Sequence, residues 1–129
     1  MRTRFRLTRD GDAFVARLTP SRTAAMREAL IQLRRPDTSD LALTLLLGTG
    51  RETVDALIER LSGGQTESRD IRFRAEELHV VHSALTAIAT MFVSREGAFL
   101  REPFHIRLGF YRENFDALAY GMAEAVSEV

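Results

Sequence analysis

The stretch TRFRLTRDGDAFVARLTPS, from Thr3 to Ser21, decides how the fold begins. Apolar residues alternate with polar ones on both sides of Asp10-Gly11, a residue pair preferred in tight hairpin turns. Thr19-Pro20 then has the pattern of a helix start, because proline is tolerated in the first helical turn. The stretch therefore predicts a β-hairpin with one buried face, followed directly by a helix.

Three arginines share the other face of the predicted hairpin. Arg2, Arg4 and Arg6 alternate with the residues expected in the core, so their side chains are expected on the outer face. Residues 1–35 hold nine arginines against three acidic residues, whereas residues 36–129 hold nine against fifteen. The two regions could neutralise one another in the fold or in a homodimer, or the basic region could form a surface for an acidic partner.

Downstream of the hairpin, helical periodicity alternates with turn signals. An apolar stripe at Ala25, Met26, Ala29, Leu30 and Leu33 predicts a helix that ends before Pro36. The remaining expected elements are a short helix capped by Ser39 or Asp40 and ended by Gly48, a helix with capping-box spacing from Thr49 to Glu52 and inward Val54, Leu57, Ile58 and Leu61, a linker from Ser62 to Ser68, a strand from Asp70 to Arg74, a helix from Glu76 to Phe92, and a last helix with inward Phe115, Leu118, Ala119, Met122 and Val126.

The sequence also resembles itself. LLGTGRETVDALIERL, residues 46–61, returns 61 positions later as RLGFYRENFDALAYGM, residues 107–122. Seven of the sixteen aligned positions are identical, whereas random matching would give about one. Upstream, Ala16 aligns with Ile71 and Leu18 with Phe73 at a separation of 55. We therefore expect two copies of one unit, each a short strand followed by helices, related by an approximate twofold axis.

The length of 129 residues suits one domain with its own core. We expect this single domain to hold the hairpin with repeat one, about residues 13–63, and repeat two, about residues 68–129. The predicted fold class is α+β, with helices packed on a small, partly antiparallel sheet and two internal pseudo-symmetric repeats.

Composition excludes several kinds of chemistry. The chain has no cysteine, so it has no disulfide, thiolate nucleophile or cysteine-based metal site. All eighteen basic residues are arginine, which excludes a Schiff-base lysine and a phosphate-loop lysine. No apolar run is long enough to cross a bilayer, so we expect a cytoplasmic protein without membrane association.

A motif Arg-Glu-x-x-Asp follows a glycine in both copies. Arginine and aspartate four residues apart on a helix can pair locally, and a glutamate is favoured in a first helical turn. We interpret the motif as structural, setting the joint between helices or across the approximate twofold axis. Its residues are Gly48, Arg51, Glu52 and Asp55 in the first copy and Gly109, Arg112, Glu113 and Asp116 in the second.

No motif has the spacing that a cofactor or a catalytic centre requires. Glu76, His79 and His82 match part of a di-metal helix pattern, but no HExxH motif accompanies them. Gly48-Thr49-Gly50 lacks the third glycine of a nucleotide-binding loop, and His105 has no triad-like companion. We therefore predict no cofactor, no metal and no enzymatic activity.

Two features suggest a binding function. Residues 41–61 have the rhythm of a helix-turn-helix, but the second helix carries more carboxylates than arginines, which disfavours nucleic acid. Aromatic residues and arginines gather around residues 95–111 in a composition typical of protein-binding surfaces. The partner-binding candidates are Arg2, Arg4, Arg6, Arg95, Phe99, Arg101 and Tyr111.

The second half resembles a group of small uncharacterised bacterial proteins. Their pattern is a strand, then E-E-L with a later A-L pair, then F-x-x-R-L-G-x-x-R-E. The matching residues here are Glu76, Glu77, Leu78, Ala84, Leu85, Phe104, Arg107, Leu108, Gly109, Arg112 and Glu113. The resemblance implies no activity, although such proteins include immunity or accessory partners of larger neighbours.

The leading hypothesis is a non-catalytic protein-interaction protein of the immunity, adaptor or assembly-factor type. Its partner would be another protein, one with an acidic surface or a second copy of the chain. The alternative is a helix-turn-helix-like protein that binds nucleic acid.

Overall fold

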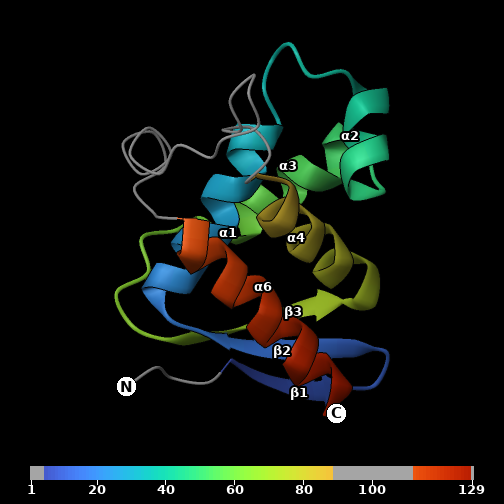
Figure 1. The fold of residues 1–129 in the computed structure, drawn as a ribbon. Helices are drawn as coiled ribbons and strands as arrows, with labels where there is room; N and C mark the ends of the chain where they lie inside the picture. Colours follow the sequence, from blue (N-terminus) through green and yellow to red (C-terminus); the bar gives the residue numbers. More distant parts are fainter. Residues whose placement is uncertain (1–4, 89–111, 129) are drawn as a thin grey trace.

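Figure 1 shows the computed structural model, which describes residues 5–88 and 112–128. This described part contains β1 (Arg6–Asp10), β2 (Ala13–Leu18), α1 (Pro20–Leu33), α2 (Asp40–Leu47), α3 (Arg51–Arg60), β3 (Arg69–Arg74), α4 (Ala75–Ala87) and α6 (Arg112–Ser127). The strands form one antiparallel sheet in the order β1-β2-β3, and helices pack against it. The predicted α+β class is confirmed, and the sheet is antiparallel throughout.

The hairpin forms where the sequence predicted it. Gly11 has φ +62°, a left-handed conformation that glycine adopts without strain in the turn. Cross-strand partners share one face of a sheet, so Leu7, Ala16 and Ile71 form one row on the core face. Arg6 faces Arg17 in the neighbouring row, on the outer face, as the alternation predicted.

Two strand–helix units lie next to each other in the sheet. β2 runs directly into α1, where Thr19 Oγ1 accepts a hydrogen bond from the Arg22 N–H at 3.2 Å, and β3 runs directly into α4. β2 pairs with β3 so that Ala16 faces Ile71, the residue with which it aligns in the sequence. An approximate twofold axis would produce this pairing, but much of the second unit lies outside the described residues. The duplication therefore stays a prediction.

Buried apolar side chains join the sheet and the helices into one core. Every residue of the predicted α1 stripe is buried, and α6 buries Phe115, Leu118, Ala119 and Met122. The inward position predicted for Val126 is wrong, because its side chain is 41% exposed. The last turn of α6 borders an open groove, so Val126 has solvent on one side.

Two glycines shape the connection from α2 to α3. Gly48 ends α2 with φ +80°, and its N–H donates to the Thr44 carbonyl at 2.8 Å, as the C-cap prediction required. The capping box predicted from Thr49 to Glu52 is wrong, because Gly50 is the N-cap of α3. Asp40, the first residue of α2, lies close enough for its Oδ1 to accept a hydrogen bond from the Arg51 N–H at 2.7 Å. A carboxylate from another helix thus replaces the local cap.

Replacing Gly50 by alanine is expected to lower the free energy of unfolding by about 1–2 kcal/mol. The backbone of Gly50 is extended and accepts a side chain, but the new Cβ would lie 2.7 Å from Asp40 Oδ1. The carboxylate must move and the cap is weakened. Urea unfolding of Gly50→Ala, Asp40→Ala and the double variant checks this. If the clash with Asp40 causes the loss, Gly50→Ala should lower the free energy of unfolding much less in the Asp40→Ala background than in the wild type. Strictly additive losses in the double variant would contradict this explanation.

Candidate functional site

The repeated motif joins α1 to α3 in the first copy. The Asp55 carboxylate accepts two hydrogen bonds from the Arg34 guanidinium, the longer of them 3.0 Å from Nη2 to Oδ2. Arg51 donates to the backbone carbonyls of Arg35, at 3.2 Å, and Thr38. Arg51 and Asp55 therefore hold the end of α1 and the loop after it, and the local pair that their four-residue spacing suggested does not form. This geometry fits a structural role for the motif.

Most of the other candidate residues lie elsewhere in the chain. Asp116 is exposed on α6, and Arg112 and Glu113 begin that helix with side chains outside the described part. Glu52 is exposed in the first turn of α3. The candidates outside the described residues are Arg2, Arg4, Arg95, Phe99, Arg101, Gly109 and Tyr111.

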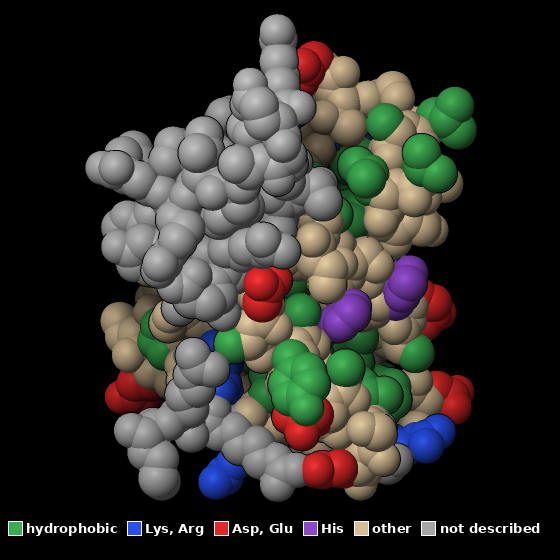
Figure 2. Space-filling model, in the orientation of Figure 1, with side chains coloured by type: hydrophobic (Ala, Val, Ile, Leu, Met, Phe, Trp, Pro, Cys, Tyr) green, Lys and Arg blue, Asp and Glu red, His purple; other side chains and the backbone are tan. Residues whose placement is uncertain are grey.

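α2 carries two leucine stripes on opposite sides. Leu43 and Leu47 are fully buried against the core. Leu41 and Leu45, also four residues apart, are 80% and 87% exposed, and Leu46 beside them is half exposed. We call Leu41, Leu45 and Leu46 the leucine surface. Figure 2 shows apolar side chains over α2 at the upper right of the molecule.

An apolar groove of about 390 Å³ lies between α4 and α6, and α4 also packs against α2. Its walls include Phe14, Leu78, Met122 and Val126, and the imidazoles of His79 and His82 lie at its edge. Among the described residues, no three histidine or acidic side chains gather as metal ligands would. The helical spacing of Glu76, His79 and His82 thus produces no cluster of that kind in this part of the chain.

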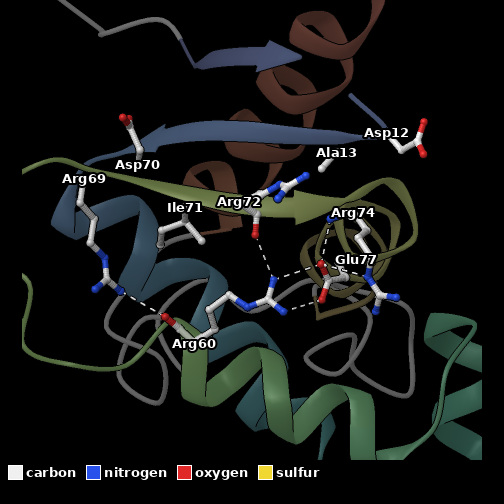
Figure 3. A pocket seen from close by; sticks show the side chains of 9 residues that line it. All are labelled: Asp12, Ala13, Arg60, Arg69, Asp70, Ile71, Arg72, Arg74 and Glu77. Carbon is white, nitrogen blue, oxygen red and sulfur yellow. Dashed lines mark hydrogen bonds and ion pairs between the residues drawn. The ribbon is translucent and has the colours of Figure 1, made fainter. Parts of the chain in front are cut away.

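A second and larger groove, of about 710 Å³, lies beside β3 (Figure 3). Its polar walls come from β3, from the end of α3, from the start of α4 and from the turn between β1 and β2. We call it the arginine groove, because four arginines line it together with three acidic residues. These seven side chains are Arg60, Arg69, Arg72, Arg74, Asp12, Asp70 and Glu77.

Arg60 and Glu77 are the fixed centre of the arginine groove. The Arg60 guanidinium donates two parallel hydrogen bonds to the Glu77 carboxylate, at 3.0 and 2.7 Å, and a third to the Arg72 carbonyl at 3.0 Å. Glu77 Oε1 also accepts from the Arg74 N–H at 2.8 Å, which caps the start of α4. The hydrogen bonds from Arg60, followed by the one from the Arg74 backbone, lower the pKa of Glu77 to about 2 against burial of the carboxyl.

The other arginines of the groove are less tightly held. Arg69 donates to the backbone carbonyls of Arg60 and Ser62, at 3.2 and 3.3 Å. Its Nε is buried and has no acceptor among the described residues. Arg72 meets Asp10 at 3.5 Å and Arg74 meets Glu77 at 3.6 Å, while both arginine side chains are about two-thirds exposed. Such exposed ion pairs contribute little and leave the guanidinium groups accessible.

The leucine surface and the arginine groove were not predicted from the sequence, although the local sequence indicates each of them in part. The segment DLALTLLL, residues 40–47, is apolar at every position except Asp40 and Thr44, and an eight-residue helix at the edge of a domain cannot bury so many apolar side chains completely. The segment RDIRFR, residues 69–74, places Arg72 and Arg74 on one face of a strand. The contribution of Arg60 had no local signal, because its partner Glu77 lies 17 residues away.

Comparisons with known proteins found no matching family model, no matching curated protein and no matching solved structure. The resemblance to small bacterial proteins therefore stays a prediction. Among the described helices, none has the length and apolar character needed to cross a lipid bilayer.

Proposed function

We propose that the protein is a non-catalytic interaction protein that docks another protein on its leucine surface. The observation that carries this proposal is the near-complete exposure of Leu41 and Leu45 on a helix already anchored by Leu43 and Leu47. Burying one leucine side chain contributes about 1.5–3 kcal/mol of favourable free energy. Folding of the chain does not gain this contribution from Leu41 and Leu45, because both stay exposed. A partner that covers them would gain it.

The surroundings of the leucine surface support a protein partner with an apolar patch. α4 packs against α2 and lines the apolar groove, and the described residues that line this groove include no arginine or acidic side chain. Figure 2 shows the apolar side chains of α2, the two histidines and further apolar side chains on the same face of the molecule. Apolar area with a polar rim is typical of protein-binding surfaces.

The test is affinity purification of the tagged chain from its host cells, with wild type and Leu41→Ser/Leu45→Ser compared side by side. We expect a stoichiometric protein partner with the wild type and at least a tenfold smaller yield with the double variant. The control is Tyr120→Ser, which changes an exposed large apolar side chain on α6, outside the leucine surface. Light scattering of the purified chain shows whether the partner is a second copy.

The proposal fails if the double variant keeps the partners of the wild type. It also fails if Tyr120→Ser loses the same partners, because the effect would then not be specific to α2. Equal thermal unfolding midpoints of wild type and double variant exclude misfolding as the cause of a lost partner.

A nucleic-acid-binding function through α2 and α3 is the weaker alternative. The exposed side of α3 presents Glu52, Ala56 and Glu59, and carboxylates repel the phosphates that a recognition helix would approach. Nuclease treatment before the affinity purification separates the two functions. A partner that disappears with nuclease would favour the alternative.

A further inference from the structure

The arginine groove has more accessible positive charge than its carboxylates neutralise. The Glu77 carboxylate is already paired with Arg60, from which it accepts two hydrogen bonds. Arg69 makes its hydrogen bonds to two backbone carbonyls, and its buried Nε has no acceptor in the described part of the chain. Arg72 and Arg74 each have one long contact to a carboxylate and extend into solvent. The groove is therefore suited to a ligand with carboxylate or phosphate groups.

The position of β3 determines how such a ligand can bind. β3 is an edge strand of the sheet, but two of its backbone groups are already hydrogen-bonded (Figure 3). The Arg72 carbonyl accepts from the Arg60 side chain, and the Arg74 N–H donates to the Glu77 carboxylate. These contacts block continuous main-chain pairing by an added strand. Recognition must then come from the side chains. The Cα atoms of Arg72 and Arg74 are about 6.5–7 Å apart on the outer face of β3, and their exposed guanidinium groups contact Asp10 of β1 and Glu77 of α4 respectively.

In an extended polypeptide with acidic residues at alternate positions, the Cα atoms of successive acidic residues are also about 6.5–7 Å apart. Nucleic acid fits the groove less well for two reasons. Asp12, Asp70 and Glu77 line the same walls and repel a continuous phosphate backbone, whereas a peptide can place uncharged residues beside them. The described residues of the lining also include no aromatic side chain on which bases could stack.

We propose that the arginine groove binds an extended acidic segment of a partner protein. Carboxylates two residues apart pair with Arg72 and Arg74, and a further carboxylate approaches Arg69. This site is separate from the leucine surface, and it can be tested without knowing the partner that docks there.

The probe is a short fluorescent peptide in which glutamate alternates with threonine, compared with a glutamine–threonine peptide and single-stranded oligothymidine. We expect fluorescence anisotropy to show binding of the glutamate peptide at low salt that weakens as salt rises. Arg72→Ser/Arg74→Ser should weaken it about tenfold or more. Serine is a favourable N-cap at position 74, so this variant should keep α4 folded.

The matched control is Arg9→Ser/Arg27→Ser, which removes the same charge from outside the groove. Arg9 lies on the core-facing side of β1 over the Phe14 ring, and Arg27 lies on α1 and donates to Ser62. We expect this control to bind the peptide nearly as well as the wild type. The proposal is overturned if the glutamate peptide does not bind at low salt, if the control loses as much affinity as Arg72→Ser/Arg74→Ser, if the glutamine peptide binds equally well, or if oligothymidine binds more tightly.

Discussion

Replacing Leu47 by alanine is expected to lower the free energy of unfolding by about 2–5 kcal/mol, while Leu45→Ala changes it by less than about 0.5 kcal/mol. The two leucines lie two residues apart on α2. Leu47 is fully buried, so truncation leaves a cavity, whereas Leu45 is 87% exposed and leaves none. Alanine is also the best helix former, so any change in helix propensity is small at both positions.

Chemical denaturation of the two variants and the wild type measures this difference directly. The comparison matters for function, because it tests which side of α2 faces the core. Equal losses at Leu45 and Leu47 would mean that the exposed stripe is covered within the chain, and the leucine surface would not be available to a partner.

Replacing Glu77 by glutamine is expected to lower the free energy of unfolding by about 2–3 kcal/mol at neutral pH. The carboxylate is nearly buried and accepts three hydrogen bonds, two from Arg60 and one from the Arg74 N–H. An amide cannot accept from both sides of the guanidinium, because its NH₂ group is itself a donor. Arg60 is partly exposed, so the loss stays below that of a fully buried ion pair.

The stabilisation that the Glu77 carboxylate contributes should depend on pH, and the lowered pKa of this group determines the direction. The pKa is about 2 in the folded protein and has an ordinary value of 4.5, so folding favours the charged carboxylate. The stabilisation is present above about pH 4.5 and is lost as the pH falls towards 2. We expect the difference between wild type and Glu77→Gln to shrink over this interval.

Unfolding free energies measured across this pH range test the prediction. The matched control is Glu76→Gln, which changes the exposed neighbour in the same helical turn and should cost less than about 0.5 kcal/mol. A difference between wild type and Glu77→Gln that stays constant down to about pH 2 would contradict the proposed role of the carboxylate.

Local patterns predicted the hairpin, the helix after it and the C-cap at Gly48, because turn residues and alternation act over a few positions. The cap of α3 was not predictable, because the sequence offers Thr49 nearby while the structure uses Asp40, eleven residues before the N–H that it caps. A contact between two helices decides this cap.

The leucine surface and the arginine groove could not be predicted from local sequence patterns either. α2 has leucines on opposite sides, so its sequence could not tell whether Leu41 or Leu43 would face the core. Packing of α2 against α4 decides this. The arginine groove likewise depends on residues from α3, β3 and α4, which only the tertiary fold brings together.

Docking of a protein partner on the leucine surface can be measured by site-specific photocrosslinking in the host cell. A photoreactive phenylalanine analogue is placed at position 45 and, for comparison, at position 59, where Glu59 is exposed on α3. We expect one dominant crosslinked protein from position 45 and none from position 59. Equal crosslinking from both positions, or none from position 45, would contradict it.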